Sequence, residues 1–263
     1  ADNIHYCLDS ISSSCNDVYI VDSGSTDNTK EIASAYDVNW YENIQNGAYS
    51  AARQRNFALD IVKEDFEWVF FLDADEIVDK FFFDRLKIEL KKIESDVDVI
   101  SIPMLYYIHE KPVKSMGFPN YHDRIMKTTC EFVSSVGEYV KSDNRLYLDD
   151  LLLHHHFNSL GMKRFIEKQS RYADYIGKQL FMYSNGENVE YLNKPGIKGR
   201  IKRLVARFGF SRVVMRFINQ YFFRLGILEG RSGFIIASYM AIFEYLVVIA
   251  KLEAKLKYEN KRL

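Results

Sequence analysis

Two carboxylates stand one residue apart directly after a strongly apolar segment. Residues 68–72 read Trp-Val-Phe-Phe-Leu and predict a strand that is buried on both faces. The residues that follow are Asp73, Ala74, Asp75 and Glu76. Ligands of open α/β sheets bind at the carboxyl ends of strands, and Mg²⁺ or Mn²⁺ is held by carboxylates together with phosphate oxygens. The spacing therefore favours a divalent-metal site at Asp73 and Asp75, and the alternative is a solvated acidic loop.

A second junction of this kind lies near the start of the chain. Residues 18–21, Val-Tyr-Ile-Val, predict a buried strand, and Asp22, Ser23 and Gly24 follow it in a small flexible turn. Ser25 and Asp27 are helix-capping residues that predict a helix through residue 35. Asp22 could accept hydrogen bonds from a base or a ribose, and a helix N-terminus favours a nearby anion. An ordinary capped turn is the alternative.

Strands that alternate with helices must position these carboxylates. Further strands are predicted at residues 38–41 and 97–102, and further helices at residues 51–62 and 82–93. This alternation indicates parallel βαβ units and an α/β fold. Residues 106–150 are irregular, and we interpret them as the acceptor side of a cleft.

The C-terminal part of the chain differs in charge from the rest. Residues 1–193 carry 20 Lys and Arg against 32 Asp and Glu, whereas residues 194–263 carry 15 against 4. The balances of −12 and +11 suggest that the tail has an anionic partner. Arginines and aromatics alternate over residues 200–228, which favours a helical element in the lipid headgroup layer. A core helix and a membrane-spanning helix over residues 233–250 are the alternatives.

Composition excludes several classes of protein. Hydrophobic residues make up 48% of the 263 residues and charged residues 27%, which excludes wholesale disorder. Cys7, Cys15 and Cys130 are an odd number without a CxxC pair, which fits a reducing cytosol and argues against a sulfur-based metal site.

The two aspartate junctions, in this order and about fifty residues apart, resemble the family 2 glycosyltransferases of the GT-A fold. Residues 47–59 look like the Arg-Asn segment of that family, and residues 66–76 like its apolar block that ends in Asp-Ala-Asp-Glu. The resemblance is closest to the branch that adds a glucosyl unit to the bacterial lipopolysaccharide core. Weaker matches follow in order at residues 124–127, 136–138, 154–157, 171–172, 225–230 and 233–234.

The sequence departs from the family pattern at two places. The first strand of the fold, with an Asn-Glu pair that helps to hold the base, is absent before the segment at residues 4–11. Gly137 stands where the family usually has His, which affects the acceptor side.

The resemblance implies a role for each candidate residue. Asp75 and Asp73 would hold Mn²⁺ or Mg²⁺ on the diphosphate, with His154 as a further ligand, and Glu76 and Arg124 would contact the acceptor. Glu138 is the first choice for the general base that an inverting transfer needs, with Glu76 next. The residues implied at the nucleotide sugar are Asp22, Ser23, Ser25, Asp27, Arg55, Asn56, Asp73 and Ala74.

The sequence thus predicts a GT-A catalytic domain at residues 1–160, with a mainly parallel sheet, a nucleotide-binding half at 1–103 and an acceptor half at 104–160. A helical, membrane-associating extension follows at 161–263. The predicted function is an inverting transfer of a hexose, glucose in first place, from a UDP-sugar to a lipopolysaccharide-core or other cell-surface glycan. The predicted partners are the nucleotide-sugar donor, the glycan or glycolipid acceptor and the anionic inner face of the cytoplasmic membrane, but not nucleic acid.

Two alternatives remain open. One is a glycosyltransferase that acts on a polyprenyl phosphate or a peptide, which would share the donor site and differ after residue 106. The other is a non-catalytic, membrane-associated protein that binds nucleotide sugars.

Overall fold

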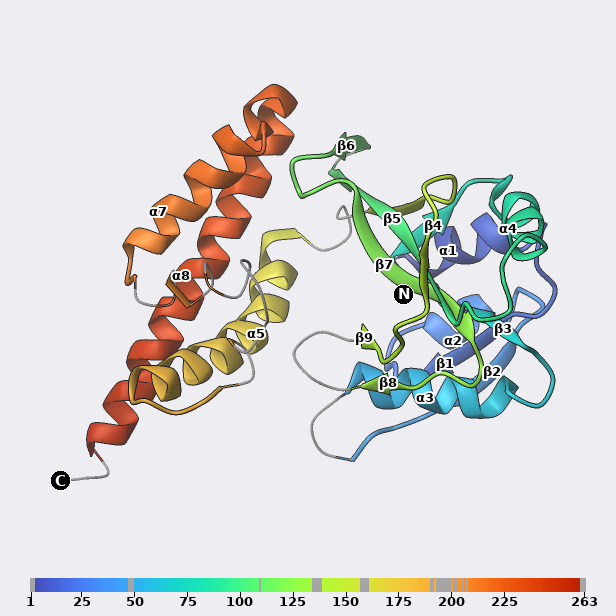
Figure 1. The fold of residues 1–263 in the computed structure, drawn as a ribbon, viewed down its shortest axis with the longest axis horizontal. Coiled ribbons are helices and arrows are strands. Elements are labelled where there is room, and N and C mark those ends of the chain that lie inside the picture. Colours follow the sequence, from blue (N-terminus) through green and yellow to red (C-terminus); the bar gives the residue numbers. More distant parts are fainter. Residues whose placement is uncertain are drawn as a thin grey trace. The chain divides into compact units, whose positions relative to one another are not determined.

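The chain divides into two compact units in the computed structural model (Figure 1). The structure describes residues 3–46, 50–108, 110–133, 139–156, 161–189, 192, 200, 203–204, 206 and 208–260. One unit, called the α/β unit below, comprises Ala1–Pro112 and Phe118–Ser159. The other, called the helical unit, comprises Leu160–Leu263 together with the short segment Val113–Gly117. The sequence predicts a division of the chain at residue 160 and does not group residues 113–117 with the helices, as the structure does.

The first two strands of the α/β unit form a small parallel sheet of their own. β1 (Tyr19–Asp22) pairs with β2 (Asn39–Glu42), with Tyr19 opposite Asn39 and Asp22 opposite Glu42. The turn between them leads into α2 (Thr29–Ala33), which is shorter than the helix that the sequence predicts up to residue 35. This sheet places Asp22 at the carboxyl end of β1.

Seven strands form the larger sheet of the α/β unit, in the order β3-β7-β5-β11-β4, with β10 and β6 also paired to β5. Their bounds are β3 (Trp68–Phe70), β4 (Glu76–Val78), β5 (Val99–Ile108), β6 (Lys111–Val113), β7 (Asn120–Lys127), β10 (Arg145–Tyr147) and β11 (Leu153–His156). Two further strands, β8 (Phe132–Val133) and β9 (Tyr139–Val140), form a separate antiparallel pair.

Strand directions in the larger sheet are mixed rather than mainly parallel. β11 and β10 run parallel to β5, whereas β7 runs antiparallel to both β5 and β3, and β4 runs antiparallel to β11. The short connection between β5 and β7 has no room for a crossover helix, so these two strands must be antiparallel. The α/β class is therefore confirmed, and the parallel pairing was overestimated.

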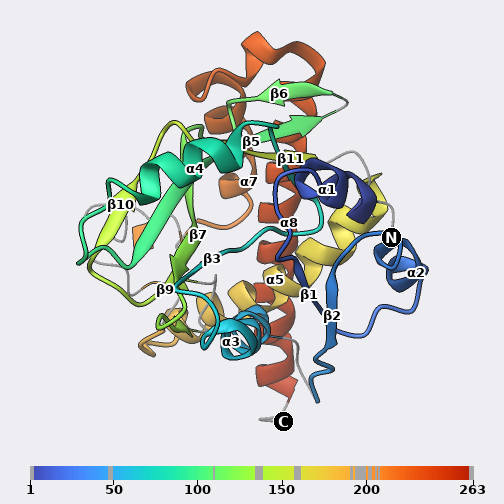
Figure 2. The ribbon, with the colours of Figure 1, turned by 90° about the vertical axis from the view of Figure 1, so that its right-hand side faces the viewer.

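Two apolar clusters hold this sheet between helices. On one side, α1 (Ile4–Ile11) and α4 (Phe82–Leu90) contribute Leu8 and Phe82 to a core with Ile100 and Leu153. On the other side, α3 (Ala51–Val62) packs Leu59 against the strands and β8. Figure 2 shows α1 and α4 on one side of β3 and α3 on the other.

The predicted burial of β3 on both faces is only partly observed. All three residues of Trp68–Phe70 are half-buried, because β3 lies at the end of the strand order and pairs only with β7 among the described strands. This position leaves the carboxyl end of β3 accessible at the edge of the sheet, where the acidic segment begins.

Long helices build the other unit. Its elements are α5 (Gly161–Ser184), α7 (Ser211–Ile218), the π-helical turn η3 (Asn219–Phe223), the 3-10 turn η4 (Gly226–Glu229) and α8 (Gly230–Asn260). A core that includes Ala173, Ile176, Leu180 and Val247 joins α5 to α8. Within the described residues, Gly226–Asn260 is long and apolar enough to cross a membrane, and only 28% of its most apolar window is buried.

Candidate active site

The acidic segment after β3 folds into a tight turn that brings Asp73 against Glu76. The Glu76 amide donates to the Asp73 carbonyl oxygen at 2.9 Å, and the Asp73 amide donates to Glu76 Oε2 at 3.0 Å. Glu76 then starts β4, with its side chain only 1% exposed. The turn therefore holds Asp73 and Glu76 at fixed positions beside each other at the sheet edge.

Two arginines from other elements hold the Asp73 carboxylate. Arg55 on α3 donates to Asp73 Oδ1 at 2.9 Å, and Arg124 on β7 donates to Oδ2 at 2.9 Å. Arg124 also contacts the Glu76 carboxylate, and its own side chain is only 7% exposed. The Asp73 side chain is still 45% exposed, so it faces both the arginines and the open site.

Opposite pKa shifts result for the two carboxyls. Burial acts to raise the pKa of Asp73, but the positive charges of Arg124 and Arg55 outweigh it and lower the pKa. Burial of Glu76 prevails over the attraction of Arg124 and raises its pKa to about 7. Asp73 is thus an ionised carboxylate, whereas Glu76 binds a proton far more readily than an exposed glutamate.

The predicted acceptor contacts of Glu76 and Arg124 do not fit this arrangement. Both side chains lie almost wholly buried and contact each other, so they present little surface to a sugar acceptor. Their geometry fits a positioning role instead, because Arg124 contacts the carboxylates of both Asp73 and Glu76.

Asp75 projects differently and lies next to a histidine. Its Oδ1 is 3.7 Å from Nδ1 of His155 on β11, and the two side chains are 23% and 12% exposed. His154, the predicted metal ligand, instead has Nδ1 3.0 Å from the hydroxyl of Tyr107. Successive residues of a strand point to opposite faces, so the histidine beside the acidic turn is His155. The structure thus places His155 beside Asp75, and His154, the residue that the sequence pattern favours, beside Tyr107.

A polar group on β7 and β5 completes the site and was missed by the sequence analysis. Asn120 Nδ2 lies 2.8 Å from His122 Nε2 and donates to the Tyr106 hydroxyl at 3.4 Å. The Tyr106 ring meets the His155 ring edge to face, at 5.4 Å between centroids. Asn120 and His122 precede Arg124 at alternate positions, and this period of two was the available signal.

His122 should make the stability of the protein sensitive to acid. Burial, and then the charge of Arg124, lower its pKa from 6.5 to about 4. A folded-state pKa below the unfolded value means that the unfolded chain binds more protons between pH 6.5 and 4, so stability is lost as the pH falls through this window. Between pH 6.5 and 4, the free energy of unfolding of the wild type should fall by up to about 3 kcal/mol relative to that of His122→Gln, at 1.36 kcal/mol per pKa unit. Urea unfolding at pH 7 and pH 4 measures this difference, and parallel pH profiles would contradict it.

The Asp22 carboxylate accepts hydrogen bonds from residues of its own turn. Asp22 Oδ2 accepts from the amides of Gly24 and Ser25, both at 2.8 Å, and Oδ1 accepts from the Ser25 hydroxyl at 2.5 Å. Gly24 has a φ of +103°, which other residues rarely adopt. Burial acts to raise the pKa of Asp22, but these hydrogen bonds outweigh it and lower the pKa. Asp27 likewise caps α2 by accepting from Thr29.

Asn56 and Arg55 tie the β8–β9 pair to the acidic turn. The Asn56 side chain donates to the Phe132 carbonyl oxygen at 3.0 Å and accepts from the Phe132 amide at 2.8 Å. The Arg55 guanidinium lies 5.3 Å from the centre of the Phe132 ring. Asn56 is thus engaged with the backbone of β8 rather than turned towards Asp73. Glu138, which precedes β9, lies outside the described residues.

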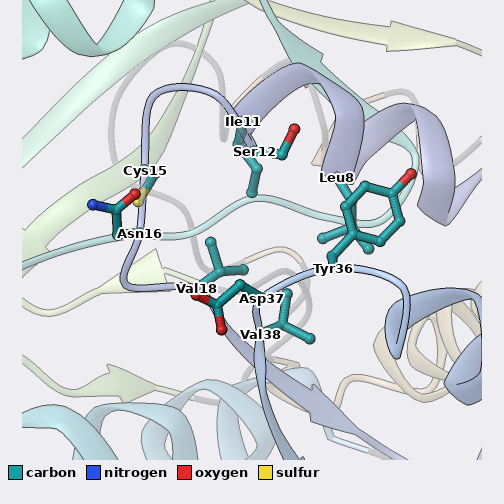
Figure 3. A pocket seen from close by; sticks show the side chains of 9 residues that line it. All are labelled: Leu8, Ile11, Ser12, Cys15, Asn16, Val18, Tyr36, Asp37 and Val38. Atoms are coloured by element: carbon teal, nitrogen blue, oxygen red, sulfur yellow. The ribbon is translucent and has the colours of Figure 1, made fainter.

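Two pockets in the described part of the chain lie away from the acidic turn. The one in Figure 3 holds about 50 Å³ and is lined by residues that include Leu8, Cys15, Val18 and Val38. Val18 and Val38 precede β1 and β2, so this pocket lies at the opposite strand ends from Asp22. A wider hollow of about 430 Å³ includes Asp123, whose carboxylate binds Ser101 and Arg145.

The side chains around Asp75 fit a divalent ion that phosphate oxygens of a bound ligand help to hold. Among the described residues, no three His, Cys, Asp or Glu side chains are arranged to bind a metal alone. Asp75 and His155 supply an oxygen and a nitrogen, while Asp73 is occupied by two arginines. Mg²⁺ and Mn²⁺ sites commonly combine one or two carboxylates with phosphate oxygens, so an ion shared with a diphosphate suits these residues.

A known protein family and a solved structure are similar to this chain. The family model described as "Glycosyl transferase family 2" matches residues 1–167. Among solved structures, the crystal structure of S. aureus TarS 1-349 is similar at a TM-score of 0.42 and 15% identity, over 92% of this chain and 87% of that chain. No curated protein matches the sequence.

Proposed function

Because the chain belongs to glycosyltransferase family 2, we propose that it transfers a hexose, with inversion, from a UDP-sugar to a hydroxyl of a cell-surface glycan. Family membership establishes a glycosyltransferase with a nucleotide-sugar donor and a glycan acceptor. Glucose as the hexose and the lipopolysaccharide core as the acceptor are the finer parts of the proposal. The observation that carries it is the Asp73–Glu76 turn, held between Arg55 and Arg124 at the edge of the sheet.

We assign Asp73 and Asp75 different parts in the binding of the donor. Asp75 and His155 would hold Mn²⁺ or Mg²⁺ on the diphosphate, and such an ion neutralises charge on the departing nucleotide. Asp73, fixed by its two arginines, is placed to accept a hydrogen bond from the ribose or to support the ion. Asp22, Ser23, Ser25 and Asp27 lie in the turn after β1 that we assign to the nucleotide, with Ala74 between the two aspartates.

The acceptor side rests on Glu138 and the polar group on β7. We assign Glu138 as the general base that takes the proton of the acceptor hydroxyl while the sugar leaves its diphosphate. Asn120, His122 and Tyr106 supply neutral donors and acceptors beside the acidic turn, which suits hydroxyl groups of a sugar.

The helical unit is the part that we assign to the membrane. The +11 balance of residues 194–263 favours the anionic inner face of the cytoplasmic membrane, where an acceptor joined to lipid would be presented. We therefore propose a cytoplasmic, peripheral location.

Thermal shift measurements with a panel of nucleotide sugars test the donor assignment. UDP-glucose should raise the melting temperature, and Mn²⁺ should increase that shift, because the diphosphate and the ion bind together. Uridine is the matched control, since it lacks the diphosphate and should show no Mn²⁺-dependent part. If every UDP-sugar gives the same shift with and without Mn²⁺, the metal-assisted donor site is wrong.

A further inference from the structure

The helical unit places charged and polar side chains inside. Arg212 on α7 and Glu244 on α8 form an ion pair at 2.6 Å, and their side chains are only 6% and 17% exposed. Gln220 in η3 is 1% exposed, and its side-chain amide donates to the Ser115 carbonyl oxygen at 2.6 Å. The helical unit thus holds an ion pair and a side-chain amide in its interior.

The one carboxylate near the turn at the start of α8 is also satisfied internally. Glu229 Oε1 accepts from the Ser115 amide at 2.8 Å, and Oε2 accepts from the Ser115 hydroxyl at 2.5 Å. The segment Val113–Gly117 thus enters the helical unit as the hydrogen-bonding partner of η3 and η4. Both oxygens of the Glu229 carboxylate are therefore engaged by Ser115.

Large apolar side chains occupy the outside of the same turn. We call this turn, residues 222–228, the apolar tip. Its exposed side chains are Phe222 (50%), Phe223 (80%), Leu225 (57%), Ile227 (46%) and Leu228 (77%). Large apolar side chains outside and charged or polar side chains inside reverse the usual order of a protein surface in water.

Close backbone packing fixes the apolar tip in this form. A Cβ atom on Gly233 would lie 1.8 Å from the carbonyl oxygen of Gly226, so α8 meets η4 where only glycine fits. Leu225 has a φ of +61°, a left-handed conformation that is unusual for a residue with a branched side chain. The exposed side chains are therefore presented by a well-packed turn.

Charge near the apolar tip points to an anionic surface as its partner. Arg224 within the tip and Arg231 just after it are both exposed. Arg212 is instead buried against Glu244, and the nearby carboxylate of Glu229 accepts hydrogen bonds from Ser115. Basic residues that flank exposed aromatics match the headgroup layer, where the arginines meet lipid phosphate and the aromatics enter the apolar boundary.

The opposite end of α8 has an ordinary water-facing surface. Exposed ion pairs join Asp174 to Lys178 on α5 and Glu253 to Lys257 on α8. In Figure 1, α7 runs beside the first part of α8 and α5 beside its later part. Glu244 stands within the apolar stretch of α8 and pairs with Arg212 on α7. A charged pair at this depth is costly within a bilayer, which favours insertion of one end only.

We propose that the apolar tip, Phe222–Leu228, inserts into the lipid bilayer and anchors the helical unit by apolar burial. This inference rests on the membrane association proposed above and names the contact that produces it. Attraction between charges fades as salt rises, whereas apolar burial does not. Binding through the tip should therefore persist at salt concentrations that remove the electrostatic part.

Tryptophan quenching in the full-length Phe223→Trp variant tests the insertion. The chain has only two tryptophans, Trp40 and Trp68, and both lie in the α/β unit. With vesicles of phosphatidylcholine and phosphatidylglycerol that carry brominated chains, the added indole should lose at least half of its fluorescence, also in 0.5 M NaCl. The matched control is Phe81→Trp on the α/β unit, whose position is 54% exposed and should not be quenched.

A second variant measures the energy of the contact. Phe223→Asp combined with Leu228→Asp should weaken partition into phosphatidylcholine vesicles about a hundredfold, the scale for two apolar side chains. Phe81→Asp combined with Ile88→Asp makes the same charge change on the α/β unit and should leave partition unchanged.

The outcomes separate the inference from the proposals that it rests on. Vesicle binding at low salt without quenching would overturn insertion and leave electrostatic association in place. No binding to any vesicle would overturn both. A wild-type dimer that the double aspartate variant converts to a monomer would make the tip an interface between copies and overturn the lipid assignment. Sugar transfer to a soluble acceptor, measured separately, tests the enzymatic proposal.

Discussion

The Asp75→Ala variant should lose all of the Mn²⁺-dependent stabilisation that UDP gives to the wild-type protein. Asp73 and Glu76 contact arginines, whereas Asp75 lies beside His155, with 3.7 Å between Asp75 Oδ1 and His155 Nδ1. In the proposed site the ion joins the diphosphate to the protein, so loss of the Asp75 ligand should remove both the ion and the metal-dependent binding of UDP. Transfer activity should also fall about a hundredfold or more. This is the scale for removal of one group that stabilises the charge developing in the transition state. Thermal shift with UDP and Mn²⁺, and a transfer assay, measure the two effects.

Asp75 gives a cleaner test than its neighbour. Asp73 binds both Arg55 and Arg124, so Asp73→Ala would remove the carboxylate that these two cations share and destabilise the fold. Asp60→Ala, at a 69% exposed position on α3, is the control for loss of one acidic charge and should keep the metal response.

The two histidines of β11 provide a matched pair for the same site. His155→Ala should weaken the response to Mn²⁺, because His155 lies beside Asp75. His154→Ala should leave it unchanged, because His154 lies beside Tyr107. Full metal-dependent binding of UDP by Asp75→Ala, or a loss confined to His154→Ala, would contradict this assignment.

The placement of the acidic turn was predictable because it follows from local pattern. An apolar segment that ends in Asp-x-Asp predicts a strand with carboxylates at its carboxyl end, and β3 with Asp73 and Asp75 has this form. The edge position of β3 was not predictable in the same way. It depends on strand order, which long-range pairing with β7 determines.

The choice between His154 and His155 also needed the tertiary structure. Alternation shows that the two side chains point to opposite faces, but not which face meets the acidic turn. Pairing of β11 with β4 on one side and β5 on the other settles this question, with His155 opposite Glu76. The segment 113–117 is a stronger case, because Ser115 and Glu229 lie 114 residues apart in the chain.

The arginines were recognised in sequence for reasons that differ from what the structure shows. Arg124 was predicted at the acceptor, yet it is buried against Asp73 and Glu76. Burial of a cation requires partners, and the two carboxylates that supply them come from a segment about fifty residues earlier. A strand pattern alone indicates which face a residue occupies, not which charges will be opposite.

Glu138→Gln should lower turnover about a hundredfold or more while donor binding is retained, which is the usual scale for loss of a general base. The segment that contains Glu138 begins and ends at the β8–β9 pair, where Phe132 is opposite Val140 and Val133 is opposite Tyr139. Asn56 binds the Phe132 backbone, and Arg55 contacts both the Phe132 ring and Asp73. These contacts join the β8–β9 pair, which flanks Glu138 in the sequence, to the acidic turn.

The size and type of the defect distinguish a base from a binding residue. Glutamine keeps the shape and hydrogen-bonding capacity of Glu138 but cannot take a proton, so kcat should fall while the UDP thermal shift stays at its wild-type value. Glu131→Gln is the matched control, because Glu131 is exposed and stands directly before β8 at the other side of the segment. Near-normal turnover in Glu138→Gln would place the base elsewhere, and an equal loss in Glu131→Gln would show that the segment tolerates no change of charge.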